Sequence, residues 1–273
     1  MPPIVLRLVL RLLWPGLVPV LGASLWLGSG AGPEDVGGTL QGLRYGALGL
    51  AVLLGWRFHR SRVLFAALTI GLGAEALYAF GSDVGSPVAE AVLVATAVNL
   101  ALLSLAGDRG LLSVVGIVTG LLLFFEGGWV LVLGRPDAGP APEWLTSEVV
   151  AFPLGSLVLT LPASTLACLL SGLVMLLCLS RREGPIDSGL FGALVAVSAA
   201  LAYPTHGALS HGLVTTGLGV LVLSVLETTY ALAYRDELTG LPSRRALNQL
   251  METLDRPYTL AMVDIDHFKK LND

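Results

Sequence analysis

The feature that most constrains this chain is a succession of apolar stretches, each about as long as a membrane is thick. A helix needs about 20 apolar residues to cross a hydrocarbon core of about 30 Å. Hydrophobic residues make up 54% and charged residues 13% of the chain, whereas soluble domains have about 45–50% and about 25%. The sequence therefore excludes a water-soluble globule and predicts an all-α polytopic membrane helical bundle. The eight predicted spans cover residues 8–28, 39–56, 63–81, 88–106, 111–133, 156–179, 188–205 and 208–232.

The arginines of the predicted loops fall mainly on one side of the membrane. Short cytoplasmic loops retain Arg and Lys, whereas short exported loops rarely contain them. The opposite loops carry mainly acidic residues, and Arg135 is their only basic residue. Both termini are therefore expected in the cytoplasm. The residues that set this orientation are Arg7, Arg11, Arg57, Arg60, Arg62, Arg109, Arg181 and Arg182.

The connection between the fifth and sixth spans, residues 134–155, is the longest in the membrane part. It contains four prolines, which interrupt regular structure because proline lacks a backbone N–H. Between Pro142 and Pro153 the sequence predicts a short surface helix from Glu143 to Val150.

Three ionisable residues stand out inside the predicted spans: Arg44, Glu75 and Glu126. A charged side chain at the centre of a span costs about 2.5–3.5 kcal/mol on insertion scales, so such residues mark functional sites by default. At a rise of 1.5 Å per residue, all three lie about 8–10 Å below the predicted outer boundary. Tyr78 and Trp129 each follow a glutamate by three residues and share its helix face. The candidate sensor cluster comprises Arg44, Glu75, Tyr78, Glu90, Glu126, Trp129 and His211.

Two interpretations of this cluster remain open. One is a pocket in the outer half of the bundle that receives a small ligand, a proton or a metal. The other is structural: Arg44 pairs with one glutamate, the other glutamate is protonated or reached by water, and the aromatic rings lie at the membrane interface. A His206–His211 metal pair is a further alternative, although a spacing of five residues does not align side chains on a helix. Asn99 is expected to form an interhelical hydrogen bond.

The last 41 residues are much richer in charge than the rest of the chain. Residues 233–273 hold 6 basic and 7 acidic side chains, whereas residues 1–232 hold 10 and 13. We therefore expect a membrane domain over 1–232 and a cytosolic segment over 233–273. The formal net charge of −4 provides no basic excess for phosphate contacts, which excludes nucleic acid as a partner.

Helix and strand signals continue into this tail. The eighth span runs without Gly or Pro from Val220 to Leu238 and is expected to leave the membrane as an unbroken helix. Ser243 is a predicted N-cap of a helix that ends near Leu254, and the apolar run Tyr258–Val263 predicts a strand.

Two acidic residues, Asp264 and Asp266, follow the predicted strand directly. Carboxylates at a strand end suit magnesium, which usually shares its ligand shell with phosphates. The backbone amides at the start of a following helix suit those phosphates. Spacing alone leaves two alternatives, a magnesium–nucleotide site or a solvated strand end.

The tail also contains two motifs in a specific order and separation. The first is Asp236-Glu237-Leu238-Thr239-Gly240-Leu241-Pro242-Ser243-Arg244-Arg245, and the second, nineteen residues later, is Asp264-Ile265-Asp266-His267-Phe268-Lys269-Lys270-Leu271-Asn272-Asp273. Together they closely resemble the opening of a GGDEF domain, the diguanylate cyclase family. The resemblance covers about the last 40 residues. Ser243 stands where the family usually has Asn, an exchange that a capping role tolerates.

The resemblance implies a ferredoxin-like α/β domain that condenses two GTP into cyclic di-GMP, in a protein of the bacterial inner membrane. By analogy, Asp264 and the Ile265 carbonyl would hold magnesium. Phe268 and Lys269 would face the triphosphate, and Asn272 would bind guanine. Each domain carries one GTP, so two domains must face each other and a homodimer is part of the mechanism. The second metal carboxylate would lie beyond the last residue, so these 273 residues alone are expected to be inactive.

Three functions follow as hypotheses. In the first, residues 1–232 are the transmembrane sensor of a diguanylate cyclase, and the outer polar cluster receives the signal. In the second, the chain is a receptor whose GGDEF-like domain is inactive and only relays the signal or binds nucleotide. In the third, the chain is a transporter and the tail resembles the cyclase family by coincidence.

Overall fold

The computed structural model describes residues 4–28, 36–80, 85–154, 157–182, 184–200, 207–236, 239–255, 259 and 261. The chain divides into two units, Met1–Thr228 and Thr229–Asp273. In chain order the elements are α1 (Ile4–Arg11), η1 (Leu12–Leu17), α2 (Val18–Gly28), α3 (Val36–Arg57), α4 (Ser61–Phe80), α5 (Pro87–Ala106), α6 (Val114–Leu133), α7 (Glu143–Thr146), β1 (Glu148–Leu154), β2 (Leu157–Pro162), α8 (Ala163–Arg182), α9 (Pro185–Ala200), α10 (Ala208–Tyr234) and α11 (Arg244–Thr253).

Six helices in the described part of the chain are long and apolar enough to cross a membrane. They are α4, α5, α6, α8, α10 and the segment Val9–Trp26, which spans α1 to α2. The chain is therefore a multi-pass helical membrane protein. The other two predicted spans form α3, whose hydropathy is lowered by Gln41 and Arg44, and α9, which covers 16 residues. That α3 and α9 also cross the membrane stays a prediction.

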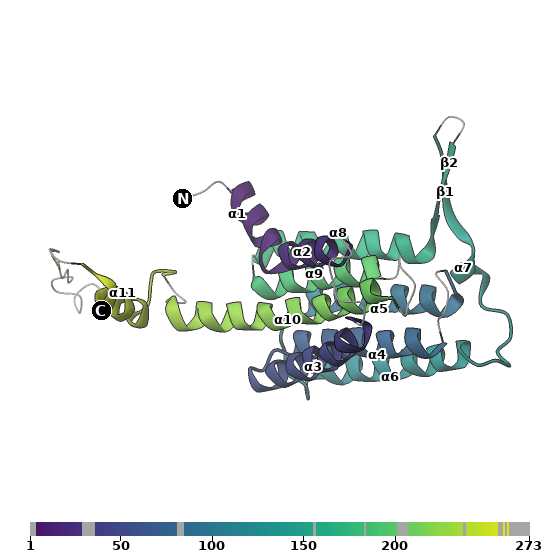
Figure 1. Ribbon diagram of the computed structural model, residues 1–273, viewed down its shortest axis with the longest axis horizontal. Coiled ribbons are helices and arrows are strands. Elements are labelled where there is room, and N and C mark those ends of the chain that lie inside the picture. The colour runs from purple at the N-terminus through teal and green to yellow at the C-terminus, as the bar shows by residue number, and fades with distance from the viewer. Residues whose placement is uncertain are drawn as a thin grey trace. The chain divides into compact units, whose positions relative to one another are not determined.

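Three of the long helices, α4, α5 and α10, form the centre of the first unit. More than half of each of their apolar stretches is buried, against less than a third for α6 and α8. Figure 1 shows these helices running alongside one another. In lipid every backbone polar group must be satisfied within the protein, which a bundle of helices achieves segment by segment. The outward leucine, valine and phenylalanine side chains of α6 and α8 can then face hydrocarbon.

Local sequence signals position several helix boundaries. Ser86 accepts a hydrogen bond from the Ala89 N–H, and Pro87 follows at the first position of α5, where its missing N–H costs nothing. Ser113 caps α6 in the same way, so this helix begins at Val114, three residues after the predicted start. The chain is kinked at Trp14 (φ −127°, ψ 131°), directly before Pro15.

The connection after α6 differs from the prediction. The expected surface helix Glu143–Val150 is wrong beyond Thr146, and the expected start of the sixth span at residue 156 is also wrong. Strands β1 and β2 pair in antiparallel register instead, with Ala151 opposite Thr160, and α8 begins after them. The hairpin stands out from one end of the bundle (Figure 1). β-Branched residues such as Val149 and Val150 favour strands, and periodicity over so short a segment does not exclude this outcome.

The second unit contains the end of α10, a turn and α11. The predicted helix after Ser243 is confirmed as Arg244–Thr253, but the Ser243 hydroxyl makes no cap hydrogen bond and donates to the Ala233 carbonyl oxygen at 3.0 Å. Within the described residues the only sheet is β1–β2. The ferredoxin-like domain therefore stays a prediction. Apart from Thr259 and Ala261, residues from 256 onward lie outside the described part, and so does the rest of the predicted strand.

Candidate functional site

Four residues of the predicted sensor cluster come together in the structure: Arg44 from α3, Glu75 and Tyr78 from α4, and His211 from α10. Tyr45, which the sequence analysis did not include, joins them. We call these five residues the Arg44 cluster. Arg44 Nη1 lies 2.7 Å from Glu75 Oε1, and the Tyr45 hydroxyl donates to Glu75 Oε2 at 3.3 Å. The adjacency of Tyr45 to Arg44 in the sequence was the available signal.

The guanidinium of Arg44 is held between two aromatic rings. Its Cζ lies 4.6 Å from the ring centroid of Tyr45 and 4.5 Å from that of Tyr78. The Arg44 side chain is 2% exposed, whereas that of Glu75 is 47% exposed. Cation–π contacts of a desolvated guanidinium are worth up to about 2 kcal/mol or more. The cation is therefore fixed by ring stacking and by one carboxylate, and its partner reaches the surface of the bundle.

The Arg44 cluster is in direct contact with α10. The ring of Tyr78 stacks on that of His211 with centroids 4.4 Å apart and an interplanar angle of 25°. His211 is buried near the start of α10. Any rearrangement of Glu75 or Arg44 that displaces Tyr78 thus acts on the helix that continues into the tail.

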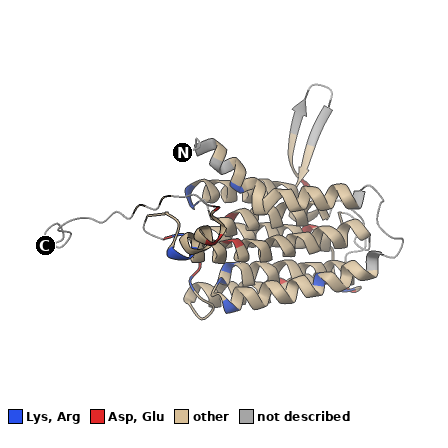
Figure 2. Cartoon of the chain, turned by 60° about the vertical axis from the view of Figure 1, so that its left-hand side comes forward, with Lys and Arg blue, Asp and Glu red and all other residues tan. Residues whose placement is uncertain are grey.

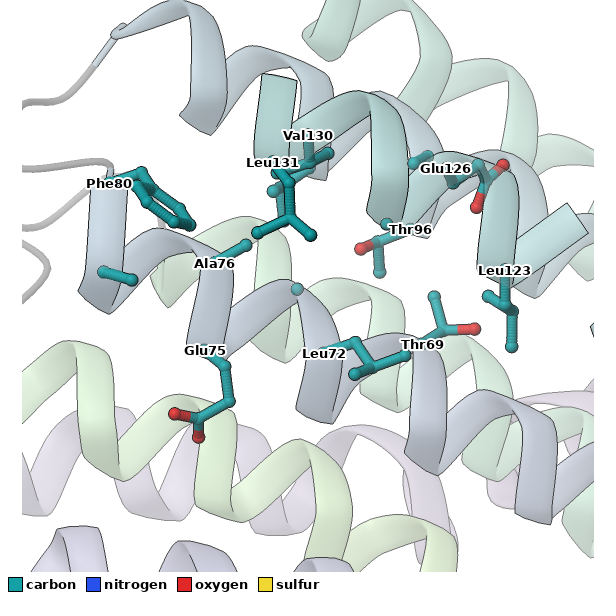
Figure 3. Close-up of a pocket in the computed structure, with 15 residues that line it drawn as sticks. Thr69, Leu72, Glu75, Ala76, Phe80, Thr96, Leu123, Glu126, Val130 and Leu131 are labelled. Carbon is teal, nitrogen blue, oxygen red and sulfur yellow. The ribbon is translucent and has the colours of Figure 1, made fainter. Parts of the chain in front are cut away.

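Glu126 is not part of this cluster. Asn99 Nδ2 donates to Glu126 Oε2 at 2.6 Å, which confirms the predicted interhelical hydrogen bond and joins α5 to α6. In Figure 3 the carboxylate of Glu75 points away from Glu126 and Thr96. A shared depth in the membrane did not imply a shared site, because depth leaves the direction of each side chain undetermined.

The remaining members of the predicted cluster also lie apart. The ring of Trp129 stacks on that of Trp144 in α7, with centroids 6.2 Å apart and an angle of 12°. Glu90 lies in the first turn of α5, and its Oε2 is buried without a hydrogen-bond partner among the described residues. His206 lies outside the described residues.

A cavity of about 270 Å³ opens between α4, α5 and α6. Its wall is almost entirely apolar, with hydroxyl groups from Thr69 and Thr96 and a carboxylate at Glu126. Figure 3 shows the Thr96 hydroxyl pointing toward Ala76 and Leu131. The lining residues are Thr69, Leu72, Gly73, Glu75, Ala76, Ala79, Phe80, Val92, Ala95, Thr96, Leu123, Glu126, Gly127, Val130 and Leu131.

A second group of charges, which the sequence analysis did not identify as a unit, lies at the opposite end of the bundle. Arg62 Nη1 lies 2.6 Å from Asp187 Oδ1, with side-chain exposures of 9% and 2%. Asp108 accepts a hydrogen bond from the Arg62 N–H at 3.2 Å and lies 3.4 Å from Arg60 Nη1. Arg182 donates to the Ser104 and Leu105 carbonyl oxygens at the end of α5. These contacts link α4, α5, α8 and α9.

The residues expected to hold magnesium and GTP lie outside the described part of the structure: Asp264, Ile265, Phe268, Lys269 and Asn272. Among the described residues no group of three or more His, Cys, Asp or Glu side chains could hold a metal ion. The magnesium site therefore stays a prediction that rests on the sequence motifs.

The described residues of the first motif form a hydrogen-bonded turn between α10 and α11. Asp236 Oδ1 accepts hydrogen bonds from the Thr239 N–H at 2.9 Å and the Thr239 hydroxyl at 2.7 Å. Gly240 has φ +68°, a conformation that glycine adopts without a steric penalty. The Ser243 N–H donates to the Tyr234 carbonyl oxygen at 2.8 Å. Several motif residues thus have a defined role in closing the turn.

Comparisons of the chain with protein-family models, with curated proteins and with solved structures find no match.

Proposed function

We propose that this chain is the membrane-embedded sensor of a diguanylate cyclase, with the start of its cytoplasmic GGDEF domain in residues 233–273. The proposal places the protein in the bacterial inner membrane with both termini in the cytoplasm. The active form is a homodimer that uses Mg²⁺ and converts two GTP into cyclic di-GMP. The observation that carries the proposal is the pair of motifs at Asp236–Arg245 and Asp264–Asp273, in the order and separation of a GGDEF domain.

The local structure of the first motif supports this assignment. Asp236, Thr239, Gly240 and Ser243 all contribute to one hydrogen-bonded turn. A coincidental likeness would not require the polar residues and the glycine of the motif to have complementary conformational roles. This argues against the transporter hypothesis, in which the tail has no defined task.

The distribution of charge supports the proposed orientation. In the membrane bundle most basic side chains gather at one end (Figure 2), where Arg60 contacts Asp108, Arg62 contacts Asp187 and Arg182 contacts the end of α5. Loops rich in arginine are retained in the cytoplasm. The Arg44 cluster then lies toward the outer side, where an external signal arrives.

Signal transfer is proposed to run through α10. This helix contains His211 of the Arg44 cluster and ends at Tyr234, two residues before Asp236. A shift or rotation of α10 would change how two cyclase domains face each other. A signal that favours one of these two arrangements changes activity, which is the differential interaction that allostery requires.

The enzymatic part is tested with the full-length protein in vesicles supplied with GTP and Mg²⁺. Cyclic di-GMP should form, and Asp264→Ala should abolish its formation because a metal ligand is lost. Asp255→Ala is the matched control, since Asp255 is exposed and precedes the second motif. No product from the wild type, together with retained GTP binding, would replace the cyclase by the inactive relay.

The sensing part is tested by comparing cyclic di-GMP output of the wild type with Glu75→Gln and Glu126→Gln over external pH and candidate ligands. Glu75→Gln should change the response, because Glu75 neutralises Arg44 next to α10. If both variants fold, dimerise and respond as the wild type does, the polar residues are structural and the sensor lies elsewhere.

A further inference from the structure

The cavity between α4, α5 and α6 has a polar group aimed into an apolar interior. Thr96 is 2% exposed, and its hydroxyl points into the cavity in Figure 3. This hydroxyl makes no hydrogen bond to any described residue. Several other helical threonines of this bundle satisfy their hydroxyls locally. Thr69, for example, donates to the Phe65 carbonyl oxygen at 2.8 Å, and Thr119 donates to that of Val115 at 2.8 Å.

This unsatisfied hydroxyl lies near the middle of the membrane. Thr96 is nine residues from the start of α5 and ten from its end, which at 1.5 Å per residue places it about 14 Å from either terminus. No bulk water is available at that depth to satisfy a polar group. A bound molecule with a complementary polar group removes this penalty.

Two glycines belong to the lining of the cavity near Thr96. A Cβ at Gly73 would lie 2.9 Å from Val92 Cγ1 and 3.5 Å from Thr96 Oγ1, so α4 and α5 pack closely beside the hydroxyl. Gly127 on α6 also lines the cavity, and a Cβ there would meet nothing within 4 Å. The cavity is therefore open on the α6 side and closed by packing on the α4 side.

The chemistry of the wall restricts the occupant. Two glutamates, Glu75 and Glu126, belong to the lining of this cavity, and they disfavour anions. Burial of an unpaired cation in an apolar wall is also unfavourable. The Thr96 hydroxyl can donate or accept one hydrogen bond. An engineered cavity of about 150 Å³ holds benzene, so by proportion about 270 Å³ holds roughly ten to twelve non-hydrogen atoms.

We infer that this cavity binds an uncharged, mainly apolar molecule of about that size, with one hydroxyl or carbonyl group hydrogen-bonded to Thr96, that enters from the bilayer. The exposed faces of α6 give access from lipid, since Phe124 and Phe125 are 74% and 69% exposed. That such a molecule regulates cyclase output is the part that rests on the proposed function. Binding itself requires only the cavity.

The test uses the full-length protein in phosphatidylcholine vesicles and a photoreactive octanol that carries a diazirine. Adducts are mapped by mass spectrometry, and excess octanol serves as competitor. We expect competed labelling of lining residues such as Leu72, Ala95 and Leu131. A photoreactive octane of the same length should label these residues several-fold less, since it lacks the hydroxyl.

Paired variants separate the hydroxyl from the space. Thr96→Val should reduce labelling about three- to tenfold, the value of one hydrogen bond, whereas Thr69→Val should not, because the Thr69 hydroxyl already donates to Phe65. Gly127→Leu should fill the cavity and abolish labelling. Gly128→Leu adds the same side chain next to it, outside the lining, and should leave labelling intact.

Three outcomes would overturn the inference: equal labelling by octane and octanol, which indicates a lipid acyl chain as occupant; adducts on Phe124 and Phe125 in place of the lining; or labelling unchanged in both Thr96→Val and Gly127→Leu. Competition of octanol with the photoreactive octanol on the wild-type protein tests binding to the cavity even if a variant fails to fold. If labelling behaves as expected but octanol leaves cyclic di-GMP output unchanged, the cavity binds the molecule and only its regulatory role fails. If labelling behaves as expected but the protein has no cyclase activity, binding stands and the proposed function fails.

Discussion

Removal of the Asp187 carboxylate should destabilise the bundle more than most single substitutions. Asp187 and Arg62 are 2.6 Å apart, and both side chains are almost fully buried. Removing one partner of a buried ion pair costs about 3–5 kcal/mol, because the other charge stays buried without compensation. Asp108 also contacts Arg62, with Oδ2 3.6 Å from Nε, so Asp187→Ala should fall near the lower limit, about 3 kcal/mol.

The assay is the fraction of monodisperse protein that survives heating in detergent, measured by size-exclusion chromatography. For a chain of this size a change of 1 kcal/mol shifts the midpoint by about 2–4 °C, so a loss of about 3 kcal/mol corresponds to a shift of about 6–12 °C. Asp137→Ala is the matched control. The Arg135–Asp137 pair is exposed, 63% and 74%, and such pairs contribute about 0–1 kcal/mol.

A double variant tests the physical reason as well as the size of the effect. Replacement of a buried ion pair by apolar residues is often neutral or stabilising, so Arg62→Leu combined with Asp187→Leu should recover most of the lost midpoint. If Asp187→Ala melts at the same temperature as Asp137→Ala and the wild type, the pair contributes nothing and the reasoning from burial is refuted.

Three further predictions concern topology and packing. In a variant without native cysteines, a cysteine at the exposed position Ser147 should react with an impermeant maleimide from outside, and one at the exposed position Arg109 only after permeabilisation; the reverse pattern would contradict the orientation. Arg44→Gln should lower the thermal midpoint, because about 2 kcal/mol of stacking and pairing is lost; an unchanged midpoint would show that the stack is not stabilising. Gly189→Ala should destabilise the α9–α10 contact, because its Cβ would lie 2.6 Å from a Cβ of α10. Gly219→Ala meets nothing within 4 Å, and equal midpoints for the two glycine variants would refute the close packing.

The sequence analysis predicted helices better than it predicted sites. Within the described residues each of the eight predicted spans contains a helix, although the sixth begins in strand β2, because runs of apolar residues have few alternatives in lipid. The segment after Pro142 was predicted as helix and is largely a hairpin, since local patterns over so few residues do not separate the two. From their predicted depth, the sequence analysis identified two glutamates, Glu75 and Glu126, as possible partners of Arg44. It could not predict that the partner is Glu75.

What the sequence determined by itself is the class of the molecule: a multi-pass helical membrane protein with a charge-rich tail. These properties follow from the length, hydropathy and order of residues along the chain, which need no knowledge of neighbours in space. Only the tertiary structure decided which polar groups meet. It joins Arg44 to Glu75, Tyr45 and Tyr78 and separates Glu126, which pairs with Asn99. The physical reason is that a side chain's direction around its helix depends on how the helices are rotated and packed against one another, and that packing is set by contacts far apart in sequence.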